Sequence, residues 1–238
     1  MPDGALKIYY LSEVAVTVEF GQQIAENLLN MVNGLNKLLY QKPFPGFNTT
    51  VPAYATLTVF YDPVLVIKTD LPGTSCFEKV SAYLNDLSLQ MTPTKPAEGD
   101  IVTIEVCYGG TFGPDLAEVA RFNGLNINDV IKLHSAATYK VYMIGFVPGF
   151  AYLGGMDERL ATPRRATPRP LVPAGAVGIA GQQTGVYPLE TPGGWQIIGQ
   201  TPLNLFDLGR QQPSLLKAGD TVIFKPVDER EFNRLAAR

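Results

Sequence analysis

The stretch from Gly145 to Gly199 constrains the fold of this chain more than any other segment. It contains eleven glycines, seven prolines and the only tryptophan, and it has no lysine and no helical period. Glycine adopts backbone angles that other residues avoid and proline fixes φ, so this density predicts turns joined by short strands. The stretch is also too rich in aromatic and aliphatic side chains to stay solvated as a disordered loop. We therefore expect an ordered surface that carries a site.

The composition indicates an ordinary globular protein and excludes several classes. The 238 residues allow one large domain or two small ones, and the net charge of −3 argues against nucleic acid as a partner. Cys76 and Cys107 lack metal-site spacing, which favours two buried free thiols. The single histidine, His134, excludes a multi-histidine metal site, and we expect no metal. The absence of a membrane-length apolar run and of a signal-peptide pattern predicts a cytoplasmic protein that does not use a membrane.

Residues 1–91 are expected to form a small α+β domain. Apolar residues alternate in the predicted strands and recur at spacings of three and four in the predicted helices. The expected order is ββαββα, with strands at 6–11, 14–20, 49–51 and 55–61 and helices at 22–39 and 74–89. Both helices are expected on one face of the sheet. The polar, proline-rich segment 92–100 is the expected linker.

Residues 101–238 are expected to form a mostly-β domain. A strand is predicted at 101–108, two short helices follow near Asp115 and at 129–134, and another strand covers 138–145. Asn126 or Asn128 is the expected cap of the second helix. Further short strands and a terminal helix near 228–238 complete the unit. A closed or partly closed β-barrel is the economical architecture, because closure removes exposed edges.

Three arginines in the segment TPRRATPRP are the first candidates for ligand binding. Arg164, Arg165 and Arg169 lie among prolines that stiffen the loop, and guanidinium groups suit a carboxylate or phosphate. The alternative is a solvated basic loop, or arginines paired with acidic neighbours, which are Asp157, Glu158 and Glu190. The residue types alone favour the alternative, whereas the rigid context makes the two interpretations about equal.

The other candidates each have a structural alternative. His134 is structural by default and could instead transfer a proton or polarise an amide. Gln183 and Thr184 could bind a polar ligand or form a turn, and Trp195 could wall a pocket or fill the barrel. Asp207 could be a cap or a site carboxylate. We expect a polar groove for a small molecule or peptide on the β-barrel. Its expected lining residues are Phe146, Pro148, Phe150 and Tyr152.

Several ordered motifs together resemble one known family. They are YGGTFGPDL, the LH ending at His134, GFVPGFAYLGG, TPRRATPRPLVPAGAVGI, QTGVYP, TPGGWQIIGQTPLNLFD and KAGDTV. This set is similar to the family of the kinase inhibitor KipI, also called allophanate hydrolase subunit 1, which includes the B subunit of bacterial ATP-dependent 5-oxoprolinase. The resemblance spans nearly the whole chain.

The resemblance implies a cyclophilin-like barrel as the second domain and a role as an enzyme subunit that is inactive alone. The implied enzyme uses ATP, bound at the level of the complex, to hydrolyse 5-oxoproline to glutamate. The implied partners are a KipA-type subunit, which is the C subunit, together with a LamB/YcsF-type subunit, which is the A subunit. By similarity to the carboxyltransferase part of urea carboxylase, the resemblance also implies that the substrate lies near His134. Alternatives within the family are inhibition of a sensor histidine kinase and a carboxyltransferase-type role in urea or amide metabolism; prolyl isomerisation rests on fold alone.

Overall fold

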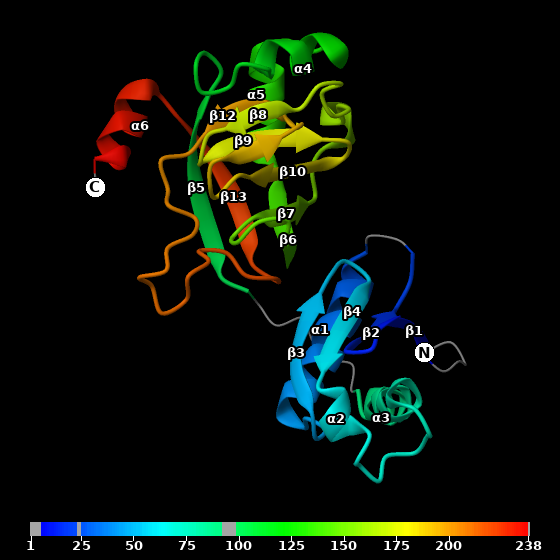
Figure 1. Cartoon of the computed structure of the whole chain (residues 1–238). Coiled ribbons are helices and arrows are strands. Elements are labelled where there is room, and N and C mark those ends of the chain that lie inside the picture. Colours follow the sequence, from blue (N-terminus) through cyan, green and yellow to red (C-terminus); the bar gives the residue numbers. More distant parts are fainter. Residues whose placement is uncertain (1–5, 23–24, 92–98, 238) are drawn as a thin grey trace. The chain divides into compact units, whose positions relative to one another are not determined.

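The computed structural model describes residues 6–22, 25–91 and 99–237, and the chain divides into two compact units (Figure 1). The units comprise Met1–Ala97 and Glu98–Arg238. Most of the linker predicted at 92–100 lies outside the described residues. Within the described ranges, no helix is both long and apolar enough to cross a membrane.

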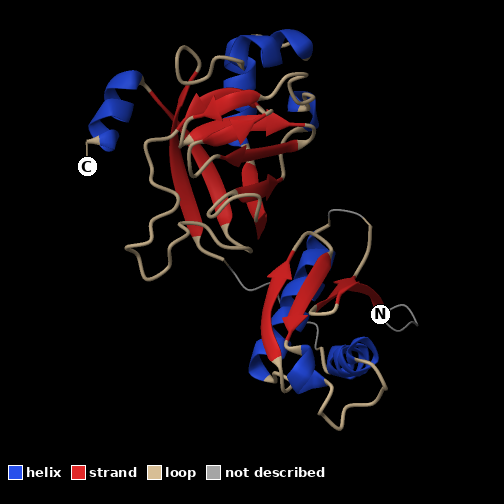
Figure 2. Cartoon of the chain, viewed as in Figure 1, coloured by secondary structure: helices blue, strands red, loops and turns tan. Residues whose placement is uncertain are grey.

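The first unit is an antiparallel sheet packed against helices (Figure 2). Its strand order is β1-β2-β4-β3. The strands are β1 (Lys7–Ser12), β2 (Ala15–Glu19), β3 (Phe47–Pro52) and β4 (Thr56–Tyr61), and the helices are α1 (Glu26–Gln41), α2 (Pro63–Val66) and α3 (Cys76–Leu89). In β4, Leu57, Val59 and Tyr61 are buried and the residues between them are half-buried, as the period of a strand requires. These side chains share one core with α1 and α3.

The described residues of this unit follow the order ββαββαα, and the sequence interpretation did not include α2. This helix has a single turn, too short to show a hydrophobic period, although Asp62 caps it and Pro63 begins it. The longer α3 begins at a capping box in which Ser75 and Glu78 each bond the other's backbone amide.

The second unit contains a closed barrel of seven strands in the order β10-β7-β6-β13-β5-β12-β9. The parallel pair β5 and β13 lies beside antiparallel neighbours. The barrel strands are β5 (Ile101–Tyr108), β6 (Thr138–Ile144), β7 (Ala151–Gly154), β9 (Ala176–Ala180), β10 (Gln183–Val186), β12 (Gln196–Gln200) and β13 (Thr221–Val227). The predicted closed barrel is confirmed.

The second unit also contains elements outside the barrel sheet. These elements are α4 (Leu116–Phe122), α5 (Ile127–Ala136), the 3₁₀ turn η1 (Glu158–Leu160), β8 (Arg169–Val172), β11 (Thr191–Gly193) and α6 (Glu229–Ala236). Asn126, one of the two predicted caps, forms a capping box with Asp129 at the start of α5. β8 and β11 form a separate two-stranded sheet within the glycine- and proline-rich stretch. This small sheet positions the arginine loop.

Candidate functional site

A buried carboxylate holds two of the three predicted arginines. Asp115 Oδ1 accepts hydrogen bonds from Arg165 Nη1 at 3.0 Å and from Arg169 Nη2 at 2.7 Å. Its other oxygen, Oδ2, accepts from the backbone N–H of Ile197 at 2.6 Å. Asp115 is 4% exposed, so these three donors replace water around the carboxylate. We call Asp115, Arg165 and Arg169 the arginine–aspartate cluster.

Two local pairings bring the arginines to Asp115. Arg169 begins β8 and lies opposite Gly193 of β11. The backbone N–H of Arg165 donates to Gly194 O at 2.8 Å. Asp115 immediately precedes α4, and its own N–H donates to the Ile197 carbonyl of β12. The cluster therefore joins the proline-rich loop to the barrel wall.

The predicted alternative partners of the arginines were wrong. Asp157 binds Arg159 instead, and the described residues show no ion pair from Glu158 or Glu190. Sequence reasoning treated Asp115 only as the beginning of a helix. The sole available signal was its place in the motif YGGTFGPDL, because nothing local connects it with arginines 50 and 54 positions away.

The cluster carries a net positive charge. Two guanidinium groups share one carboxylate, and Arg164 beside them is exposed, with no ion pair among the described residues. Arg165 and Arg169 keep 37% and 23% of their side chains exposed, so the charge is accessible from solvent. Arg165 Nε, Arg169 Nη1 and the nearby Gln196 Oε1 are buried without a hydrogen-bond partner in the described part of the chain. The exposed parts of the two guanidinium groups suit an anionic ligand.

Five aromatic side chains form a second cluster in the same stretch. The ring centroid of Phe150 lies 5.4 Å from those of both Tyr187 and Trp195, in edge-to-face geometry. Tyr152 and Phe146 flank Phe150 at 4.9 and 5.5 Å. Trp195 is 5% exposed, in agreement with the core interpretation of its ring. We call these five residues the aromatic cluster; Tyr187 was not among the predicted site residues.

Tyr187 connects the aromatic cluster with the arginines. A Cβ atom at Gly193, the residue opposite Arg169, would lie only 2.5 Å from the Tyr187 hydroxyl oxygen. Burial raises the pKa of Tyr187, and the positive charges of Arg164 and Arg169 act in the opposite direction. The hydroxyl edge of the aromatic cluster therefore faces the cationic loop. A ligand with an anionic end and an apolar body matches this juxtaposition.

Phe146 is the exposed member of the aromatic cluster and has a strained backbone. Its φ is 69°, and it is the one non-glycine residue with positive φ that the described chain shows. The residue is 61% exposed, so burial does not compensate for this conformation. Strain of this kind is concentrated at binding and active sites. Phe146 is accordingly the strongest apolar candidate for contact with a ligand.

His134 lies inside the barrel domain, away from solvent. It is 0% exposed, and burial lowers its pKa to about 3. Tyr108 Oη lies 2.8 Å from Nδ1, and Thr184 Oγ1 lies 2.9 Å from Nε2. Because Thr184 donates its hydroxyl proton to Gly178 O, it accepts from Nε2–H, and Nδ1 then accepts from Tyr108. This enclosure favours the structural interpretation of His134 and Thr184, and proton transfer by His134 stays a prediction.

The remaining predicted site residues are more dispersed. Gln183 begins β10 and is half-buried, and Pro148 is exposed beside Phe146 in the loop before β7. Asp207 closes its own turn, accepting from Gly209 N at 2.8 Å. The Asp207 carboxylate also lies 3.8 Å from Arg210 Nε. No hydrogen bond or ion pair joins Asp207 to the arginine–aspartate cluster within the described ranges.

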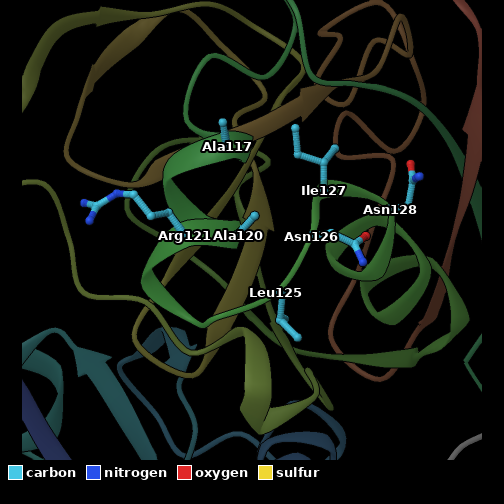
Figure 3. Close-up of a pocket in the computed structure, with 7 residues that line it drawn as sticks. All are labelled: Ala117, Ala120, Arg121, Leu125, Asn126, Ile127 and Asn128. Carbon is cyan, nitrogen blue, oxygen red and sulfur yellow. The ribbon is translucent and has the colours of Figure 1, made fainter.

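An open pocket of about 560 Å³ lies between α4 and α5 (Figure 3). Its lining comprises Ala117, Ala120, Arg121, Leu125, Asn126, Ile127 and Asn128. None of the predicted site residues lines it. No group of three or more metal-ligating side chains occurs among the described residues.

The fold and the site together define a two-unit barrel protein with a candidate site for a small anion. The family model for the carboxyltransferase domain, subdomain C and D, matches residues 6–216, and the chain belongs to this family. It is 46% identical to the B subunit of 5-oxoprolinase from Bacillus subtilis (strain 168), over 95% of each chain. It is also 58% identical to the Escherichia coli O157:H7 protein of that name, over 56% of this chain and 61% of the relative. The family resemblance drawn from the motifs is therefore confirmed.

A solved structure contains a similar fold within a longer chain. The crystal structure of TTHA0988 superimposes with a TM-score of 0.76 at 33% identity. The match covers 93% of this chain and 40% of TTHA0988. This chain thus corresponds to less than half of that protein, although it matches the Bacillus subtilis relative along almost its full length.

Proposed function

We propose that this chain is the B subunit of an ATP-dependent 5-oxoprolinase, which hydrolyses 5-oxoproline to glutamate. The observation that carries the proposal is the 46% identity to a 5-oxoprolinase B subunit over 95% of both chains. The complete enzyme includes a KipA-type C subunit together with a LamB/YcsF-type A subunit, and this chain is inactive without them. Within this proposal the barrel is of the cyclophilin-like kind. The cytoplasmic location stays a prediction.

The geometry of the site supports this substrate. 5-Oxoproline is a small ring that carries one carboxylate, so it combines an anionic end with a compact body. The exposed parts of Arg165 and Arg169, with Arg164 beside them, suit the carboxylate through charge-assisted hydrogen bonds. Phe146 offers an exposed aromatic face for the ring. These residues bind and orient the substrate.

The difficult step is attack on an unstrained lactam. ATP, bound at the level of the complex, would supply a phosphoryl group to the lactam oxygen with release of ADP, which would make the ring carbon electrophilic; the phosphate would leave when water opens the ring. The contribution of this chain is to hold the substrate carboxylate at a fixed place, so that the lactam bond is presented in one orientation to groups from the partner subunits. The family's other outcomes, kinase inhibition and carboxyl transfer, stay predictions.

The test is ATP-dependent release of glutamate from 5-oxoproline by the three purified subunits mixed together. The variant Arg169→Ala removes one charge-assisted donor, worth about 1.5–3 kcal/mol, and is expected to raise the KM for 5-oxoproline roughly 10- to 100-fold. Arg159→Ala is the matched control, because Arg159 forms its ion pair with Asp157 on the surface. An absence of glutamate release with all three wild-type subunits would overturn the proposal. Equal KM values for 5-oxoproline in the two variants would show that the arginine loop does not bind the substrate.

A further inference from the structure

We propose that Asp115 is a positioning residue that fixes Arg165 and Arg169 in a ligand-ready arrangement. The inference rests on the proposed function, because it concerns the same site, and it adds a residue that no sequence pattern assigned. Asp115 does not touch the ligand, since it is 4% exposed behind the two arginines. It acts through the guanidinium groups that it holds.

The hydrogen bonds of Asp115 separate this role from an ordinary helix cap. Asp115 occupies the N-cap position of α4, where an aspartate normally accepts a bond from the first turn. Its side chain makes no such bond. Both carboxylate oxygens are used elsewhere: Oδ2 by the Ile197 amide of β12, and Oδ1 by the two arginines. Asp115 could have capped α4, but its carboxylate binds the two arginines and the Ile197 amide instead.

The arrangement reduces the cost of binding an anion. A free arginine side chain has many rotamers. If a ligand has to order it, the lost conformational entropy weakens binding. Asp115 restricts Arg165 and Arg169 before the ligand arrives, and its link to Ile197 fixes the carboxylate itself to the barrel wall. Because one negative charge is shared by two positive ones, the cluster stays cationic after this ordering.

Two physical effects predict opposite signs for removal of Asp115. Coulomb's law alone predicts that loss of a nearby negative charge strengthens the binding of an anionic substrate. Positioning predicts the reverse, because the released guanidinium groups lose their orientation. The sign of the change in affinity for the anionic substrate therefore distinguishes positioning from the Coulombic effect, whatever the size of the change.

The decisive variant is Asp115→Asn in the complete three-subunit enzyme. Positioning predicts a rise of about tenfold or more in the KM for 5-oxoproline with the KM for ATP unchanged, and partial rescue by Asp115→Glu. The matched control is Asp157→Asn, which neutralises an aspartate paired with Arg159 outside the site, and it is expected to leave both KM values unchanged. An unchanged or lowered KM for 5-oxoproline in Asp115→Asn would overturn the inference.

A second measurement tests the inference independently of enzyme activity. In the wild-type chain, ¹H–¹⁵N relaxation of the arginine side-chain Nε–H groups should show Arg165 and Arg169 as rigid and Arg164 as mobile. In Asp115→Asn, the first two should become as mobile as Arg164. Equal mobility of all three in the wild type would overturn the positioning role even if the variant does not fold. If the wild-type enzyme releases no glutamate while the two arginines are rigid, the proposed function fails and the role of Asp115 stands.

Discussion

The buried imidazole of His134 makes the stability of the barrel domain depend on pH in a calculable way. Burial lowers the pKa of His134 to about 3 from its ordinary value of 6.5. The unfolded chain therefore binds a proton below pH 6.5, whereas the folded chain stays neutral there until about pH 3. The contribution of the neutral imidazole is complete above pH 6.5 and is lost progressively as the pH falls from 6.5 towards 3.

The size of the loss follows from the difference between the two pKa values. At pH 5 the unfolded imidazole is stabilised by protonation by about 2 kcal/mol relative to pH 8, since each pH unit below its pKa corresponds to about 1.4 kcal/mol. Below pH 3 the loss reaches about 5 kcal/mol, an order-of-magnitude figure. The two carboxylates with the most strongly lowered pKa values do not obscure the loss between pH 8 and pH 5. Asp157 and Glu78, whose hydrogen bonds lower their pKa values to about 2, lose their contributions only below their ordinary values of 3.8 and 4.5.

The assay is urea unfolding at pH 8 and pH 5, followed by the fluorescence of Trp195. Trp195 is the only tryptophan and lies in the same unit as His134, so the signal reports this unit. The free energy of unfolding is expected to fall by about 2 kcal/mol between the two pH values. In His134→Gln the stability at pH 8 is lower, because the bonds to Tyr108 and Thr184 are disturbed, and the pH dependence in this window disappears.

The same histidine can be observed directly, because the chain has only one. Its imidazole NMR signals should not titrate between pH 8 and pH 5, and the ¹⁵N shifts should show a proton on Nε2 and none on Nδ1. A titration midpoint near 6.5, or equal stability at pH 8 and pH 5, would refute the reasoning. Either result would mean that solvent reaches the ring and would favour the proton-transfer role of His134.

Two further predictions concern the strained loop and the buried hydrogen-bond chain. Phe146→Gly relieves a positive φ that costs about 1–3 kcal/mol, so the free energy of unfolding should stay the same or rise slightly. The KM for 5-oxoproline should rise, because the exposed ring is lost. The control Phe150→Ala removes a buried ring and should cost about 3–5 kcal/mol in urea unfolding. A large loss of stability in Phe146→Gly would show that the ring is structural. Thr184→Val leaves buried groups unpaired and should cost about 1–3 kcal/mol, whereas Thr17→Val, at a half-buried Thr–Thr pair, should cost less than about 1 kcal/mol. Equal costs in the two threonine variants would contradict the assigned chain of bonds.

Hydrophobic period predicted the elements that are long enough to show it. The strand at Ile101–Tyr108 and the helices ending at Gln41 and Leu89 were anticipated from spacing alone, with boundaries that differ by a few residues at most ends. The short strands between Gly145 and Gly199 were expected only as a group. In β9, Ala176–Ala180, every residue is buried, so the alternation that identifies a strand is missing.

The candidate site was predictable by residue type and only partly by geometry. The arginine loop and its aromatic neighbours were identified because glycine and proline restrict the backbone around them. Asp115 was missed because its ion pairs join residues 50 and 54 positions apart, which only the closure of the barrel brings together. The burial of His134 could not be predicted from the sequence either, because its hydrogen-bond partners lie 26 and 50 positions away.

The most direct test of the account is the dependence of 5-oxoproline hydrolysis on the arginine–aspartate cluster. The wild-type chain, Arg169→Ala and Arg159→Ala are each mixed with the two proposed partner subunits and assayed for ATP-dependent glutamate release. The account predicts activity in all three, with a KM for 5-oxoproline raised roughly 10- to 100-fold in Arg169→Ala alone. Wild-type kinetics in Arg169→Ala would contradict it, as would the absence of glutamate release from the wild-type complex.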